Sequence, residues 1–319
     1  MASLSGVLPA LVTPLDTGGR LDRAGLDRLL DHVLAAPVTG IAPAGSTGEG
    51  PLLGLATRVE LTRAVRDRLG DGPWVVAGVP ARNAPEALTE IDALAKAGAS
   101  AVLLPPPWYY PVGTAEVVSY FGAIAGSSAL PIVAYHIPRL TKVALSPEAM
   151  AELAPHPGIV GIKDSGGDPA HLAAVVEACA GYDLAVMTGT DSAMLAALAA
   201  GAAGLIGASV NVVPGLVTRL YAAARAGDEE QSARLQLQVA AVVDACGALG
   251  FPQAWKAALF VLGVCSARPA HPLVAPDADA LAGLDSELRR LGLTRRREGL
   301  RGPDSGGGVP GDPSRQRRR

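Results

Sequence analysis

The sequence contains little cysteine, which argues against two kinds of protein. Cys179, Cys246 and Cys265 are the only three cysteines among 319 residues. Because their number is odd and their spacing is wide, they do not match the pattern of a disulfide framework or of a thiolate metal site. Each lies in an apolar helical pattern, so we expect three buried free thiols.

The sequence also lacks any apolar run of membrane-spanning length that is free of glycine, proline and charge. The N-terminal residues Met1 to Leu4 have no basic region ahead of a long apolar core, which a secretory signal would require. The formal net charge of −3 gives no reason to expect nucleic acid or an anionic membrane as a partner. We therefore expect a globular, cytoplasmic protein.

What the sequence does contain is a regular alternation of short strands and amphipathic helices. The expected strands are 7–13, 40–44, 74–79, 100–105, 131–135, 159–163, 183–188 and 203–208. Eight such units in roughly 250 residues predict an α/β protein with a closed (β/α)8 TIM barrel. A Rossmann-like sheet is the alternative, and the absence of a G-x-G-x-x-G motif after the first strand weakens it.

Beyond residue 210, helical patterns follow one another with no strand between them. They cover 217–226, 229–249, 253–262 and 277–291. We therefore expect a barrel over 1–226 and a C-terminal helical extension over 227–293. Residues 294–319 are rich in arginine, glycine and proline, which predicts a disordered tail.

Polar groups follow several of the expected strands. Tyr135 ends the fifth strand and Lys163 ends the sixth, while the segments 45–49 and 189–191 follow the second and seventh. In a barrel of this kind, reacting groups lie at the carboxyl ends of the strands. We therefore expect these groups to meet on one face of the barrel.

Lysine is scarce, with only four residues in the chain. Lys96 lies on a charged helix face, and Lys256 follows an apolar pattern in which it is expected to pair or to extend toward solvent rather than to react. Lys163 closes a buried strand, where a low dielectric disfavours the ammonium form and leaves an amine that attacks ketones to form a Schiff base. An ion pair with Asp164 or another carboxylate is the alternative interpretation.

The segment Gly45-Ser46-Thr47-Gly48-Glu49 is not a Walker loop, because no Gly-Lys-Ser/Thr follows it. Its two hydroxyl groups and the backbone N–H groups beside its glycines suit a small carboxylate. A plain turn is the alternative.

Four motifs, in this order, resemble the dihydrodipicolinate synthase and N-acetylneuraminate lyase family of class I, Schiff-base lyases. They are Gly45-Ser46-Thr47-Gly48-Glu49, Pro107-Trp108-Tyr109-Tyr110-Pro111, Tyr135-His136-Ile137-Pro138 and Gly161-Ile162-Lys163. The resemblance covers residues 6–293 of the sequence. It implies a (β/α)8 barrel with a C-terminal helical region, a homotetramer, and catalysis without a metal or an organic cofactor.

The resemblance also implies roles for individual residues. Lys163 would form the imine with the keto carbon of pyruvate or another 2-oxo acid, and Tyr135 would carry protons to and from the substrate. Ser46, Thr47 and Gly48 would bind the substrate carboxylate.

A further role implied by the resemblance involves a second subunit. Tyr109 would reach the active site of a neighbouring copy of the chain.

The motifs also bear on the branch of the family. Dihydrodipicolinate synthases generally place an arginine two residues after the proline of the tyrosine motif, where this chain has Leu140, with Arg139 one position earlier. Lyases for long sugar acids usually follow the seventh-strand Gly-x-Asp with glutamate, where this chain has Ser192, and Ala208 stands where serine is common. The last two positions argue against sialic acid itself. We therefore favour a lyase or aldolase that releases pyruvate from a 2-oxo acid, for example a 2-keto-3-deoxy sugar acid, and keep an N-acetylneuraminate-like substrate open.

The acceptor end of such a substrate would be bound by a set of residues after the fifth, sixth and seventh strands, namely Arg139, Ser165, Gly189, Thr190 and Asp191. Two alternatives within the family stay open: a 4-hydroxy-tetrahydrodipicolinate synthase that uses Arg139, and a catalytically silent binding protein. A metal-dependent aldolase would need histidines and carboxylates at strand ends. The sequence instead places His32, His156, His171 and His271 in helical or loop patterns.

Overall fold

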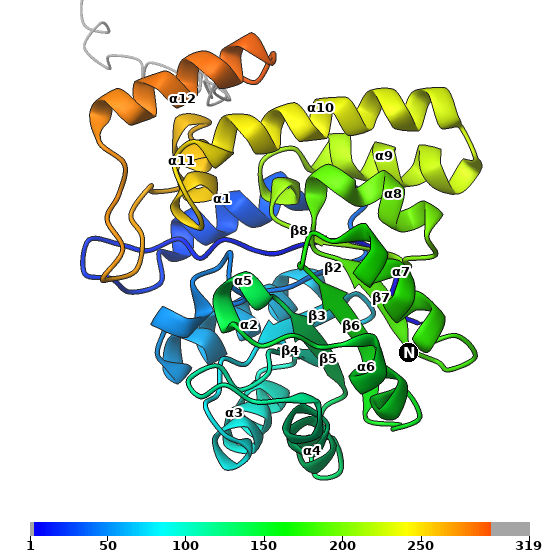
Figure 1. The fold of residues 1–319 in the computed structure, drawn as a ribbon. Coiled ribbons are helices and arrows are strands. Elements are labelled where there is room, and N and C mark those ends of the chain that lie inside the picture. Colours follow the sequence, from blue (N-terminus) through cyan, green and yellow to red (C-terminus); the bar gives the residue numbers. More distant parts are fainter. Residues whose placement is uncertain (1–2, 295–319) are drawn as a thin grey trace, which may run out of the picture.

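The central feature of the structure, a computed structural model that describes residues 3–294, is a ring of eight parallel strands (Figure 1). The strands follow one another in the order β1-β8-β7-β6-β5-β4-β3-β2. A parallel bridge between Ala10 and Ala42 joins the two ends of this order and closes the barrel. The strands are β1 Gly6–Pro9, β2 Gly40–Ile41, β3 Trp74–Gly78, β4 Ala101–Leu104, β5 Ile132–His136, β6 Ile159–Asp164, β7 Ala185–Thr188 and β8 Gly204–Gly207.

Helices cover the outside of this barrel. They are α1 Arg23–Leu34, α2 Leu55–Leu69, α3 Ala84–Lys96, α4 Thr114–Ala125, α6 Pro147–Leu153, α7 Pro169–Ala178, α8 Met194–Ala199 and α9 Pro214–Ala226. The short helix α5 Pro138–Thr141 follows β5 at the carboxyl end of the barrel, where Arg139 lines a cavity. Side-chain caps fix several of their starts: Asp22 accepts from Gly25 N at 3.0 Å, and Asp168 accepts from Ala170 N at 2.9 Å. Such caps satisfy N–H groups that a first helical turn leaves without partners.

Three further helices, α10 Glu229–Gly247, α11 Gln253–Val261 and α12 Ala278–Arg290, follow the barrel. Figure 1 shows α10 lying along α9, with α11 and α12 beside it. Leu235 of α10 and Leu259 of α11 belong to the same buried apolar cluster as Leu29 of α1 and Leu220 of α9. The C-terminal helices therefore share a core with the barrel and cover one side of it.

The predicted α/β barrel with C-terminal helices is confirmed. Each of the eight expected strands is present, but β1 ends at Pro9 rather than at residue 13. Backbone bonds continue from Ala10 N to Gly207 and from Leu11 N to Ala42, but Val12 N donates to the side chain of Asn211 at 3.0 Å, so the expected strand does not extend to residue 13. The short helix α5 and the 3-10 helices η1 Gly50–Leu52, η2 Asp191–Ala193 and η3 Ser209–Asn211 were not predicted.

The expectations for the cysteines, for membrane-spanning helices and for the C-terminal tail can be compared with the structure in turn. Cys179, Cys246 and Cys265 are buried free thiols, as predicted. Among the helices of residues 3–294, none has the length and apolar character needed to cross a bilayer. Apart from Thr294, the predicted tail 294–319 lies outside the described residues, and the domain boundaries stay a prediction.

Candidate active site

Lys163 and Tyr135 meet at the carboxyl ends of neighbouring strands. They are paired residues in the β5–β6 ladder, so their side chains leave the sheet on the same face. The Lys163 amine lies 4.6 Å from the centroid of the Tyr135 ring. Both side chains line a cavity of about 450 Å³, which is large enough for a small metabolite.

Lys163 is only 4% exposed. Within residues 3–294, no carboxylate forms an ion pair with its amine, and Asp164 pairs instead with His171, at 2.8 Å between Oδ2 and Nδ1. The alternative interpretation of an ion pair between Lys163 and Asp164 is therefore wrong. A buried amine without an anionic partner suits a nucleophile better than a structural cation.

The loop after β2 brings Thr47 to the cavity wall. The neighbouring Ser46 is half-buried and does not line the cavity. Gly48 lies where a side chain would collide with the carbonyl oxygen of Leu11, and its own carbonyl oxygen accepts from Thr13 Oγ1 at 2.7 Å. The loop is thus tightly packed, with one of its two predicted hydroxyl groups facing the cavity.

A buried ion pair fixes the same loop from the side of the C-terminal helices. Glu49 Oε1 lies 2.8 Å from Lys256 Nζ of α11, and both side chains are buried. Lys256 also donates to the carbonyl oxygen of Arg268 at 2.9 Å, while Glu49 accepts from Ala270 N. Lys256 therefore pairs, as the sequence indicated.

The loop after β7 contributes three of the predicted residues, Gly189, Thr190 and Asp191, to the cavity wall. Gly189 leaves room for the Lys163 side chain, because a side chain at position 189 would collide with Lys163 Cε and Ser165 Oγ. Ser165, at the end of β6, lines the cavity beside it.

The carboxylate of Asp191 is largely engaged within the protein. Its Oδ1 accepts from Ser209 N at 2.9 Å and from Ser209 Oγ, and its Oδ2 accepts from Ala208 N at 3.2 Å. Asp191 therefore fixes the loop after β8, and this role adds to its predicted contact with substrate.

The far wall of the cavity was not predicted. Its side chains come from α10, α11 and the turn between them, and they are mostly apolar: Val243, Cys246, Gly247, Gly250, Phe251, Ala254 and Trp255. The Arg139 guanidinium stacks over the Phe251 ring, 4.3 Å from its centroid. Burial, with a smaller contribution from Asp191, raises the pKa of Cys246 to about 12, so this thiol lines the wall as a neutral group.

Tyr109 lies away from this cavity. It is 74% exposed and stacks edge-on against its neighbours Trp108 and Tyr110. A single copy of the chain does not bring this tyrosine to Lys163, so its predicted role depends on a neighbouring subunit.

Outside the barrel wall, His136, Asp164 and His171 form a cluster that the sequence analysis missed. Their nearest ligand atoms lie within 4.8 Å of one another. A neutral histidine that binds a metal through Nε2 keeps its proton on Nδ1, but His136 Nδ1 accepts the N–H of Leu145 at 3.0 Å. Hydrogen bonding therefore disfavours a metal ion at this cluster.

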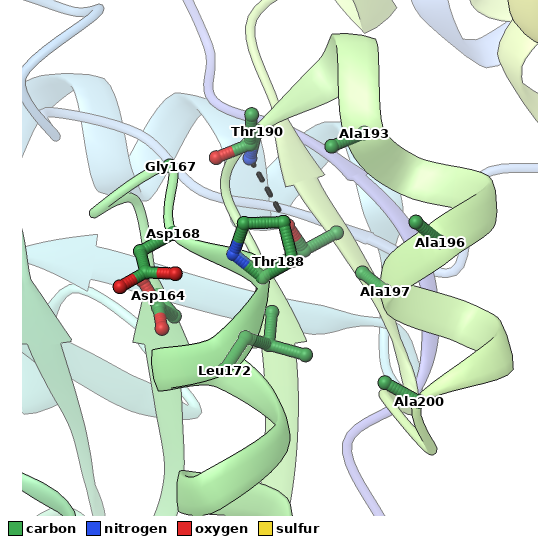
Figure 2. Close-up of a pocket in the computed structure, with 11 residues that line it drawn as sticks. Asp164, Gly167, Asp168, Leu172, Thr188, Thr190, Ala193, Ala196, Ala197 and Ala200 are labelled. Atoms are coloured by element: carbon green, nitrogen blue, oxygen red, sulfur yellow. Dashed lines mark hydrogen bonds between the residues drawn. The ribbon is translucent and has the colours of Figure 1, made fainter.

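A second, much smaller cavity of about 40 Å³ lies outside the barrel between α7 and α8. Figure 2 shows Leu172 and a row of alanines in and beside α8 around it, with Thr190 at its edge. Thr190 N donates to Thr188 Oγ1 at 3.1 Å, which is the dashed line in Figure 2. This cavity is too small for a metabolite, and the larger cavity around Lys163 is the candidate active site.

Known proteins resemble this chain along most of its length. The family model described as the dihydrodipicolinate synthetase family matches residues 3–290. The 4-hydroxy-tetrahydrodipicolinate synthase of Methanospirillum hungatei is 33% identical over 84% of this chain and 92% of its own length. An uncharacterized DapA-like lyase of Halobacterium salinarum is 35% identical over 91% of this chain and 95% of its own length.

Solved structures that resemble this chain are described as members of the same family. YagE, a prophage protein of the dihydrodipicolinic acid synthase family from E. coli K12 in complex with pyruvate, has a TM-score of 0.86 and 29% identity, covering 92% of this chain and all of the other. The chloride-inhibited dihydrodipicolinate synthase of Acinetobacter baumannii, also complexed with pyruvate, has a TM-score of 0.87 and 28% identity over 91% of this chain and all of the other. The chain therefore belongs to the dihydrodipicolinate synthetase family and is a lyase of the class I, pyruvate-dependent aldolase type.

Proposed function

We propose that Lys163 forms the imine and that the enzyme cleaves a 2-oxo acid to release pyruvate. The observation that supports this most directly is the buried Lys163 amine, which lies beside the Tyr135 ring in the cavity and has no carboxylate partner within residues 3–294. The amine attacks the keto carbon, water leaves, and a protonated imine forms. This imine withdraws electrons from the adjacent carbon atoms.

Bond cleavage then follows from the imine. The C3–C4 bond breaks and its electron pair moves into the imine, which gives an enamine, while the C4 hydroxyl group loses its proton and becomes the aldehyde. Tyr135 is the proposed proton carrier, because its ring centroid lies 4.6 Å from the amine in the same cavity. Protonation of the enamine at C3 and addition of water release pyruvate and restore the Lys163 amine.

The pyruvate moiety occupies the inner part of the cavity in this proposal. Thr47 binds its carboxylate, because it is the residue of the loop after β2 that lines the cavity. Ser46 and Gly48, which the resemblance also assigned to the carboxylate, do not line it and hold the loop around Thr47. Gly189 leaves room for the imine, since it lies directly against Lys163 Cε.

The acceptor fragment is the part of the substrate that is released as the aldehyde. It extends toward Ser165, Thr190 and Asp191 and toward Arg139. Because Arg139 presents a guanidinium group over Phe251 at the apolar wall, we propose that the released aldehyde carries a carboxylate. A 2-keto-3-deoxy sugar acid with a terminal carboxylate meets this requirement.

The second candidate is 4-hydroxy-tetrahydrodipicolinate synthase, which joins pyruvate to aspartate semialdehyde. The names of several relatives favour it, and aspartate semialdehyde also carries a carboxylate for Arg139. The position that holds an arginine in most synthases is Leu140, which is half exposed and does not line the cavity.

We also propose a homotetramer in which Tyr109 contributes to the cavity of a neighbouring subunit. Its support is the exposed aromatic group Trp108, Tyr109 and Tyr110. Sedimentation of the wild type and of Tyr109→Ala tests this: a wild-type monomer that turns over substrate as fast as any oligomeric fraction would contradict it.

The central experiment is reduction with borohydride in the presence of pyruvate, followed by peptide mass analysis. We expect the pyruvate-derived mass on Lys163 and on no other lysine, and no adduct in Lys163→Ala. An unmodified wild-type Lys163 would refute the proposal. Pyruvate release from a panel of 2-keto-3-deoxy acids, measured beside condensation with aspartate semialdehyde, then separates the two candidates.

A further inference from the structure

The outer faces of β5 and β6 carry polar side chains that the proposed chemistry does not use. His136 and Asp164 follow Tyr135 and Lys163 directly in sequence, so they leave the sheet on the opposite face. His171 of α7 lies against both of them. Its ring stacks on His136 with centroids 4.2 Å apart, and its Nδ1 lies 2.8 Å from Asp164 Oδ2.

The two histidines hold one loop residue between them. Leu145, fully buried between α5 and α6, donates its N–H to His136 Nδ1 at 3.0 Å. Its carbonyl oxygen lies 2.9 Å from His171 Nε2. Because side chains from a strand and from a helix bind the two backbone groups of Leu145, the position of this loop depends on both rings.

The hydrogen-bond partners of the two imidazole rings indicate which of their nitrogens donate and which accept. A backbone N–H can only donate, so His136 Nδ1 is unprotonated and this ring is neutral. At His171, the Asp164 carboxylate lies against Nδ1 and the Leu145 carbonyl oxygen lies against Nε2, so each ring nitrogen faces a hydrogen-bond acceptor.

Charged groups around His136 act in opposite directions. Burial is the main cause that lowers the pKa of His136; His171 of α7 lowers it further, and Asp164 of β6 opposes the shift. Glu148 of α6 adds a negative charge that interacts with His171. His136 is therefore neutral at pH 7 and takes a proton only in acid.

The cluster is directly connected to the cavity. The segment held at Leu145 begins with Ile137 and Arg139, which line the acceptor side. On β6, Asp164 Oδ1 accepts from Gly166 N at 2.7 Å and so fixes the turn that presents Ser165 and Gly166 to the cavity.

We propose that His136, Asp164 and His171 are positioning residues that clamp the 137–145 segment at the acceptor side of the cavity and release it in acid. A proton on His136 Nδ1 would face the N–H of Leu145, so this hydrogen bond is lost. The added positive charge would also lie against the stacked His171 ring, which disfavours the charged form of His136. The functional consequence rests on the role proposed for Arg139, but the clamp is measured without any substrate.

Hydrogen–deuterium exchange of the 138–146 segment at pH 7.5 and 4.5, expressed as protection factors, tests the clamp. The acidic value lies well below the ordinary pKa of a histidine, because burial lowers the pKa of His136. We expect wild-type protection to fall about fivefold or more at pH 4.5, as the loss of one buried hydrogen bond predicts. His136→Asn keeps an acceptor, Oδ1, near the place of Nδ1 but cannot titrate, so its protection stays at the wild-type level at both pH values. His136→Leu has low protection at both.

Two controls and one replacement variant keep this result specific. His271→Gln removes an exposed histidine and behaves as the wild type, and exchange of α4 reports any global opening. If His136→Leu does not fold, His171→Asn replaces it. This variant keeps a donor to Asp164 but loses the bond to Leu145, so it has low protection at both pH values.

Other outcomes refute the clamp. They are wild-type protection that does not change with pH, or an acid-induced loss that His136→Asn shares. Borohydride trapping of pyruvate on the same samples tests the proposed function separately. If pyruvate is still trapped on Lys163 but the exchange data refute the clamp, only the clamp is contradicted.

Discussion

Lys163 and Asp164 are adjacent in the chain but lie on opposite sides of the barrel wall. The Lys163 amine lies inside the cavity beside the Tyr135 ring, whereas the Asp164 carboxylate binds His171 and the N–H of Gly166 outside it. Successive side chains of a strand point to opposite faces, so the carboxylate nearest in sequence is kept away from the amine. This arrangement leaves Lys163 available for imine formation.

Removal of the Tyr135 hydroxyl group should separate imine formation from turnover. In Tyr135→Phe, Lys163 keeps its position and is still trapped by pyruvate and borohydride. Pyruvate release should fall about 10²- to 10⁴-fold, because the proton carrier is lost. Tyr182→Phe, a half-exposed tyrosine elsewhere, is the matched control, and full turnover by Tyr135→Phe would rule out the proposed role.

Arg139 should determine affinity for the acceptor fragment. In Arg139→Gln, we expect KM for a 2-oxo acid with a distal carboxylate to rise about tenfold to a hundredfold, as the loss of a charged hydrogen bond predicts. Trapping of pyruvate should not change. Arg225→Gln removes an arginine that lies over Tyr221, 5.9 Å from the ring centroid and outside the cavity lining, and is the matched control. Equal effects on KM in both variants would contradict the assignment.

The buried pair of Glu49 and Lys256 should be important for stability. Lys256→Met leaves the Glu49 carboxylate buried without its partner, which should cost about 3–5 kcal/mol of unfolding free energy. Guanidinium unfolding followed by circular dichroism measures this. Arg23→Ala breaks the exposed pair with Glu60 and should change stability by about 0–1 kcal/mol; similar losses in both variants would show that burial does not matter here.

Stability should rise with pH through the range in which His136 loses its proton. Burial lowers the pKa of His136 in the folded state, so the unfolded chain binds more protons between that lowered pKa and the ordinary value of about 6.5. Unfolding free energy therefore falls as pH decreases from about 6.5. His136→Asn should remove this part of the pH dependence, and an unchanged slope in that variant would refute the explanation.

The three thiols should react slowly in the folded protein. Burial raises the pKa of Cys179 to about 11 and is the main cause that raises those of Cys246 and Cys265 to about 12, so little thiolate is present at pH 8. An aromatic disulfide reagent should label all three only after denaturation. Rapid labelling of the native protein would show that one of these side chains becomes accessible.

Local patterns were sufficient to predict most of the fold. Apolar strands alternate with amphipathic helices in the sequence, and these periodicities depend only on neighbouring residues. The same patterns placed Tyr135 and Lys163 at strand ends, where the barrel rule brings them together. The short helix α5 was missed because four residues, Pro138–Thr141, are too few to show a helical period.

The sequence by itself thus determined the barrel, the lysine and tyrosine at one end of it, and the burial of the cysteines. Only the tertiary structure decided which distant residues meet: Glu49 with Lys256, Arg139 with Phe251, and His136 with His171. These contacts join elements far apart in the chain, and they depend on the packing of α7 and the C-terminal helices against the barrel. Neither hydrophobic period nor motif spacing records that packing, so the apolar wall and the outer cluster could not be predicted.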